Sequence, residues 1–165
     1  MRTLNIDMDG VVVDFDKGFA KQTGMDFYTS RWHLLKSSRV GFYANLPRAS
    51  GLQKFLAGVV AATAGKNIQV RFLTALPSQL DFPLIVAEKQ FWVRENCNDT
   101  LPEGVDSWQV AVANSSADKH TFCTPGDILI DDNVLNVAQW SKAGGVALHH
   151  HNLATSLKWL EELLK

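Results

Sequence analysis

Two aspartates one residue apart follow the first apolar run of the chain. Asp7 and Asp9 stand in the stretch LNIDMDGVVVDF, with aliphatic residues on both sides. Carboxylates in such surroundings are costly to bury unless a cation meets them, so a metal site or a pair of catalytic carboxyls is favoured over a polar strand end. An EF-hand is excluded, because a loop starting at Asp7 would place Val12 where glycine is needed.

Four further polar side chains stand at or after the ends of other predicted strands. They are Thr74, Lys119, Asp131 and Asp132. The carboxyl ends of parallel strands meet at one edge of a sheet, where ligands bind. The carboxylates would repel one another there and demand a cation, and Mg²⁺ is the hard divalent ion that suits oxygen ligands. We therefore expect a Mg²⁺ site at this edge.

The same residue types suit phosphoryl chemistry. Mg²⁺ and Lys119 can neutralise a phosphate, and Thr74 can donate a hydrogen bond to it. One aspartate can attack phosphorus and form an aspartyl-phosphate. The second can protonate the leaving oxygen and then deprotonate the water that cleaves the intermediate.

Hydrophobic patterning predicts the elements that position these groups. The predicted strands cover residues 4–8, 68–74, 108–113, 127–132 and 146–150, and the predicted helices cover 52–64, 82–95, 134–143 and 153–164. Ser50 and Asp81 are the predicted N-caps of the first two helices, and Gly65 is the predicted stop of the first. Strands alternating with helices predict one α/β domain over residues 1–165, a Rossmann-like parallel sheet with helices on both faces. The aromatic-rich segment 17–46 is predicted to be a small helical cap inserted in this domain.

Bulk properties narrow the class of protein. The formal net charge of −1 implies no general affinity for a nucleic acid polymer or an anionic membrane. The two cysteines, Cys97 and Cys123, form neither a CxxC motif nor a disulfide framework. No apolar run approaches a membrane span or a signal peptide, so a cytoplasmic location is expected.

The ordered motifs resemble a known family over nearly the whole chain. DMDGV, a strand-end threonine, a lysine and LIDD stand in the order found in the haloacid dehalogenase superfamily of phosphohydrolases. The stretches GFYANLP, QVRFLTALP and GDILIDD further resemble the 5'(3')-deoxyribonucleotidase branch, which removes phosphate from nucleoside monophosphates. The resemblance implies a Mg²⁺-dependent phosphomonoesterase with a nucleoside monophosphate, in particular a deoxyribonucleotide, as its small-molecule substrate.

The resemblance also implies roles for individual carboxylates. Asp7 would be the nucleophile and Asp9 the general acid/base. The Asp7 carboxylate, the Asp9 backbone carbonyl and Asp132 would hold Mg²⁺, with Asp131 beside them.

Four other residues would contact the substrate by the same resemblance. Thr74 and Lys119 would bind the phosphate, and Phe15 and Phe42 would face the nucleoside. Ala75 departs from the branch, where a serine usually follows the motif threonine, and the cap is short. The departures concern the exact substrate more than the reaction. Three alternatives are open beside this prediction: another small phosphomonoester, a polynucleotide 3'-phosphate, or a non-catalytic nucleotide-binding protein.

Two other motifs carry no site in this reading. Adjacent residues in the run His149–His151 point to opposite faces of a strand, so all three cannot easily hold one ion. The glycines of Gly58–Asn67 have the wrong spacing for a P-loop. The sequence leaves a monomer and a homodimer equally open.

Overall fold

Five strands form one parallel sheet in the order β3-β2-β1-β4-β5. They are β1 (Arg2–Ile6), β2 (Ile68–Ala75), β3 (Gln109–Ala113), β4 (Ile128–Asp131) and β5 (Val146–His149). The first strand lies at the centre, between β2 and β4. The computed structural model describes residues 1–24, 40–77 and 82–165. The predicted helix N-cap Asp81 and the middle of the predicted insertion at 17–46 therefore lie outside the described residues.

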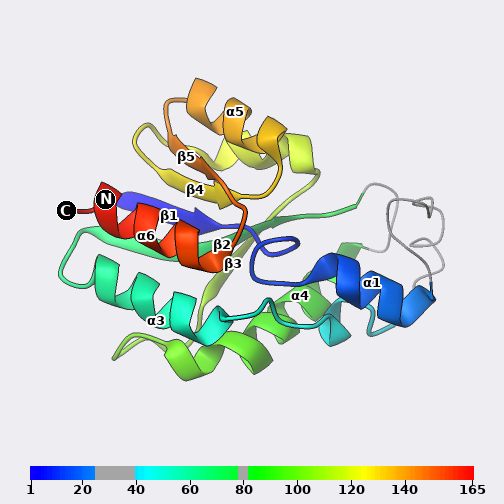
Figure 1. Ribbon diagram of the computed structural model, residues 1–165. Coiled ribbons are helices and arrows are strands. Elements are labelled where there is room, and N and C mark those ends of the chain that lie inside the picture. Colours follow the sequence, from blue (N-terminus) through cyan, green and yellow to red (C-terminus); the bar gives the residue numbers. More distant parts are fainter. Residues whose placement is uncertain (25–39, 78–81) are drawn as a thin grey trace.

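Helices cover both faces of the sheet, and the predicted α/β class is confirmed. The α-helices are α1 (Phe15–Thr23), α3 (Leu52–Thr63), α4 (Phe82–Cys97), α5 (Val134–Lys142) and α6 (Leu153–Leu163). The 3₁₀ turns are η1 (Tyr43–Asn45), η2 (Asn98–Thr100) and η3 (Ser116–Phe122). Helices α3, α4 and α6 lie on one side and α5 on the other, while α1 lies beyond the carboxyl ends of the strands (Figure 1). No helix in the described part of the chain has both the length and the apolar character needed to cross a bilayer.

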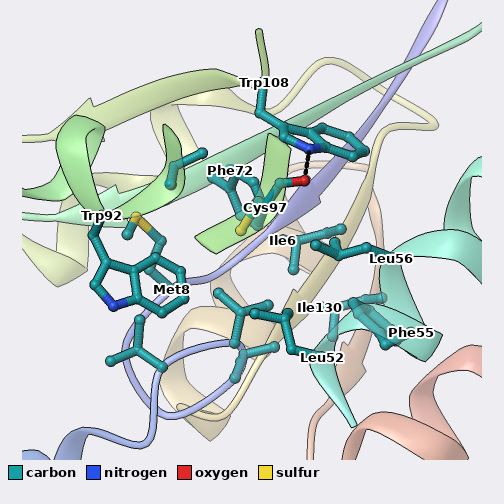
Figure 2. Close-up of a cluster of buried hydrophobic side chains, with 14 of the residues drawn as sticks. Ile6, Met8, Leu52, Phe55, Leu56, Phe72, Trp92, Cys97, Trp108 and Ile130 are labelled. Atoms are coloured by element: carbon teal, nitrogen blue, oxygen red, sulfur yellow. Dashed lines mark hydrogen bonds between the residues drawn. The ribbon is translucent and has the colours of Figure 1, made fainter. Parts of the chain in front are cut away.

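The larger core lies between the sheet and α3, α4 and α6. Alternate strand residues such as Ile6, Phe72 and Ile130 point to this side, as the two-residue period of a strand requires. They belong to the same buried cluster as Phe55 of α3 and Trp92 of α4 (Figure 2). This packing holds in place the strands whose carboxyl ends carry the predicted site residues.

The opposite face has a smaller apolar core. Leu73, Leu129 and Trp140 form it, with α5 and η3 above the sheet. Part of this face is polar, because Arg71 donates from Nε to Asn5 Oδ1 at 2.6 Å. The connection from β3 to β4 contains the 3₁₀ turn η3 where an α-helix often stands.

The helix after the insertion begins at Leu52 as predicted, but its N-cap is not the predicted residue. Gly51, not Ser50, is the N-cap of α3, and its φ of 84° lies in the left-handed region. Glycine enters that region without a Cβ penalty, so the chain turns at Gly51 and leaves Ser50 outside the helix. The predicted serine cap is therefore wrong. At the other end α3 stops at Thr63, with Ala64 as C-cap and Gly65 just beyond at a φ of 69°.

Candidate functional site

A tight loop after β1 presents both aspartates at the sheet edge. The Asp7 N–H still pairs with the Ile130 carbonyl at 2.9 Å, so Asp7 continues the sheet. The next residues fold back, and the N–H groups of Val12 and Val13 donate to the Met8 carbonyl at 3.0 and 2.9 Å. The three valines that follow the motif are buried, and this burial anchors the loop. The apolar residues around the aspartates therefore serve to hold their backbone.

Three carboxylates and one ammonium form what we call the carboxylate cluster: Asp7, Asp131, Asp132 and Lys119. One oxygen from each aspartate lies within 4.8 Å of the others. The Lys119 Nζ lies 2.7 Å from Asp7 Oδ1 and 2.8 Å from Asp131 Oδ2. These residues come from the ends of β1 and β4 and from η3, as predicted from parallel strands.

The carboxylate cluster contains more negative than positive charge when its aspartates are ionised. Burial, with the charges of Asp131, Asp9 and Asp132, raises the pKa of Asp7 well above its ordinary value even though Lys119 pulls it down. Partial burial and the Asp131 charge raise the pKa of Asp132 to about 6. Burial alone would lower the pKa of Lys119, but Asp7 and Asp131 more than offset it and the pKa is raised. The ammonium is therefore held charged among carboxylates that it does not fully neutralise.

Asp131 is already saturated with donors. Its Oδ1 accepts from the Asn133 N–H at 2.9 Å and from Asn136 Nδ2 at 3.0 Å, and its Oδ2 accepts from Lys119. Asp132, in contrast, is exposed toward the cavity. The oxygens available to a further cation are therefore those of Asp7 and Asp132, with Asp131 behind them.

The cluster fits a divalent metal ion. Its donors are carboxylate oxygens, which Mg²⁺ prefers, and the three carboxylates have a single ammonium, that of Lys119, among them. Gly10 permits the close approach of Asp132, since a Cβ at Gly10 would lie 2.1 Å from Asp132 Oδ2. The φ of 83° at Gly10 also disfavours any other residue.

Asp9 belongs to a separate arrangement, which we call the Lys89 network: Asp9, Thr74 and Lys89. The Lys89 Nζ lies 2.5 Å from Asp9 Oδ2 and 2.9 Å from Thr74 Oγ1. Lys89 comes from α4 and is 1% exposed. A fully buried ammonium thus pairs with the second aspartate of the motif.

Glu88, the residue before Lys89, links helix α4 to the backbone of Gly41 and Tyr43. Glu88 accepts hydrogen bonds from the Gly41 N–H at 2.5 Å and from the Tyr43 N–H at 2.9 Å. The Tyr43 ring centroid lies 4.7 Å from the Lys89 Nζ, within the range of a cation–π contact. Glu88 and Lys89 therefore connect Tyr43 with Asp9.

The sequence analysis missed Glu88 and Lys89, although a signal was present. Ile85, Glu88, Lys89 and Trp92 fall at helical spacing on one face of α4, and all four are buried. Two charged residues within an apolar helical stripe indicate a buried polar function. Asn136 was also missed, and only the structure shows its contact with Asp131.

A cavity of about 650 Å³ opens over both groups. Five of the predicted site residues line it: Asp7, Asp9, Phe15, Lys119 and Asp132. Its walls include Tyr43 on the cap side and His150 on the α6 side, while Ser116 lies near Lys119 in sequence and adds a hydroxyl.

Two predicted substrate contacts lie beneath the cavity surface instead. Thr74 is 0% exposed, and its hydroxyl accepts from Lys89. Phe42 is 4% exposed and packs against Phe15, with ring centroids 6.0 Å apart. In this conformation Thr74 supports Asp9 through Lys89, and Phe42 supports the Phe15 wall, because neither side chain reaches the cavity.

No family model matches this chain, and no curated protein matches it significantly.

Proposed function

We propose that this protein is a Mg²⁺-dependent phosphomonoesterase of the haloacid dehalogenase type, acting on nucleoside 5'- or 3'-monophosphates and preferring deoxyribonucleotides. One observation carries the proposal: Asp7 and Asp9 line a single cavity, one beside a cation-deficient carboxylate cluster and the other paired with a buried lysine. Pure binding needs no such division between two carboxylates. The substrate preference rests on the sequence resemblance alone.

The residues of this chain can divide the reaction between them. Asp7 attacks phosphorus as the ester P–O bond breaks, and Asp9 gives a proton to the leaving oxygen. A water then attacks the aspartyl-phosphate and gives its proton to Asp9, so that Asp7 is released. Lys119, which is held charged by its neighbours, offers its ammonium to the phosphate oxygens. Mg²⁺ held by Asp7 and Asp132 would supply the remaining positive charge.

The cavity suits a small nucleotide better than a polymer. Its volume of about 650 Å³ lies in the ordinary range for small-molecule sites. Phe15 and Tyr43 offer aromatic surfaces on the cap side, which suit the flat face of a base. Lys119 is the one lysine or arginine among the described lining residues, which fits one phosphate and not a polyanion.

The test is phosphate release from a panel of ribo- and deoxyribonucleoside 5'- and 3'-monophosphates, sugar phosphates and a 3'-phosphorylated oligonucleotide. We expect release from nucleoside monophosphates with Mg²⁺, loss with EDTA and recovery when Mg²⁺ is restored. Asp7→Asn should lose at least about 1,000-fold in turnover, because an amide cannot form the acyl-phosphate. Asp106→Asn, at an exposed position far from the cavity lining, is the matched control and should behave as the wild type.

Three outcomes would contradict parts of this proposal. Release only from sugar phosphates or the oligonucleotide would keep the chemistry and overturn the substrate. Near wild-type turnover by Asp7→Asn would overturn the nucleophile. Tight nucleotide binding without release from any compound would favour a binding protein.

A further inference from the structure

The two oxygens of the Asp9 carboxylate have different surroundings. Oδ2 accepts from the Lys89 ammonium at 2.5 Å. Oδ1 is buried and, among the described residues, has no hydrogen-bond partner. A buried acceptor without a partner is costly, so the Lys89 ammonium is the contact that offsets the burial of this carboxylate.

Lys89 lies below the cavity and not in it. Its side chain is 1% exposed, and it is absent from the described residues that line the cavity. The same ammonium donates to Thr74 Oγ1 at 2.9 Å and faces the Tyr43 ring at 4.7 Å. Contacts on three sides leave the Lys89 head group one position, so the Asp9 carboxylate that it holds is fixed as well.

We propose that Lys89 is a positioning residue that holds the Asp9 carboxylate in the place from which it exchanges a proton with the substrate. This inference rests on the proposed phosphomonoesterase function. Lys89 acts through Asp9 and touches neither substrate nor phosphorus. Glu88 supports the same geometry, because it fixes the backbone of Tyr43 above Lys89.

The proton balance of the two steps follows from this geometry. In the first step the Asp7–P bond forms, the ester P–O bond breaks, and the leaving oxygen takes the proton from the Asp9 carboxyl group. In the second step water attacks phosphorus, gives a proton to the Asp9 carboxylate, and the Asp7–P bond breaks. Lys89 keeps its proton in both steps and remains bonded to Oδ2.

The experiment compares two substrates that differ in their need for a proton. One is the nucleoside monophosphate that the wild type hydrolyses fastest, whose leaving alkoxide must be protonated. The other is 4-nitrophenyl phosphate, whose leaving group is stable as an anion. With enzyme in excess over substrate and Mg²⁺ present, release of the leaving group in a single turnover measures the first step alone.

Lys89→Met should slow release of the nucleoside by on the order of 100-fold, the typical contribution of a well-placed general acid. Release of nitrophenolate should fall by less than about tenfold, because that step needs little help from an acid. Asp9→Asn should show the same selectivity. Lys54→Met, which removes an exposed lysine on α3, is the matched control and should change neither rate.

Equal losses for the two substrates would overturn the positioning role, since they would show damage to phosphate binding or to the fold. If Lys89→Met does not fold, as judged by circular dichroism, Lys89→Gln, whose side chain is shorter and uncharged, replaces it and is held to the same criterion. An inactive wild type would overturn the proposed function and this inference with it. That result differs from an active wild type whose variant loses both rates equally.

Discussion

The carboxylate cluster and the Lys89 network lie side by side but carry different charge. In the cluster, three carboxylates share the Lys119 ammonium, so two negative charges remain when all are ionised. In the network, Asp9 has the Lys89 ammonium to itself. The difference leaves uncompensated negative charge on one side only. Two aspartates from one short motif thus receive separate electrostatic environments, which is the arrangement that separate chemical roles require.

The largest expected effect comes from Lys119→Met, which would deepen the charge deficit of the cluster. Removing one partner of a buried ion pair costs about 3–5 kcal/mol, so the free energy of unfolding should fall by that order without metal. Mg²⁺ should restore more of this loss than it adds to the wild type, because it neutralises the same carboxylates. Urea denaturation with and without Mg²⁺ measures both quantities.

Lys89→Met is the counterpart that tests the contrast. It should also destabilise the protein, since Lys89 is the buried partner of Asp9. Mg²⁺ should stabilise this variant no more than it stabilises the wild type. Equal recovery of both variants by Mg²⁺ would show that the two regions are a single electrostatic unit.

A smaller effect is expected from Gly10→Ala, which acts on the cluster alone. The new Cβ would collide with Asp132 Oδ2, and the φ of 83° adds backbone strain of about 1–3 kcal/mol. Mg²⁺ affinity, measured by calorimetry, should fall because Asp132 must move. Gly24→Ala is the matched control, as its φ is 72° but nothing lies within 4 Å of its Cβ. An equal loss of Mg²⁺ affinity in both variants would exclude crowding of Asp132 as the cause.

The smallest effect concerns the cavity wall beside the cluster. Burial, with His151 and His149 nearby, lowers the pKa of His150 from 6.5 to about 4. The folded protein therefore disfavours the protonated ring, and its stability should be retained above pH 6.5 and lost as the pH falls toward 4. The loss should be about 1–2 kcal/mol between pH 7 and pH 5.

His150→Asn should remove this component and flatten the dependence of stability on pH. Urea denaturation at a series of pH values measures it. His120→Asn, at an exposed histidine, should keep the slope of the wild type. A variant at position 150 with an unchanged slope would show that another group carries the acid sensitivity.

The sequence predicted the carboxylate cluster because parallel strands make residue position informative. The residue at or after the end of a strand is brought to the shared edge whatever the intervening helices do. Asp7, Lys119, Asp131 and Asp132 were found this way, and the structure brings them together. This prediction required neither the order of the strands in the sheet nor their register.

The Lys89 network could not be found in that way, because Lys89 reaches the site from the middle of a helix. Its depth depends on how α4 rotates against the sheet, which is set by packing around Trp92 and not by strand ends. The burial of Thr74 has the same origin, since it was predicted from its strand position without the lysine that covers it. The positions of strand ends do not predict how a helix is rotated against the sheet, and so do not predict which of its side chains reach the site.

The central position of β1 has a consequence for the order in which the chain completes its site. All three residues of the Lys89 network belong to the first 89 residues. Pairing of β1 with β2 brings the strands of Asp9 and Thr74 together, and Lys89 reaches them from α4. The cluster needs β4, whose Ile128 pairs with Leu4 across the other edge of β1. Since a chain is synthesised from its N-terminus, all three residues of the Lys89 network are present in the nascent polypeptide before Lys119, Asp131 and Asp132 of the carboxylate cluster are added.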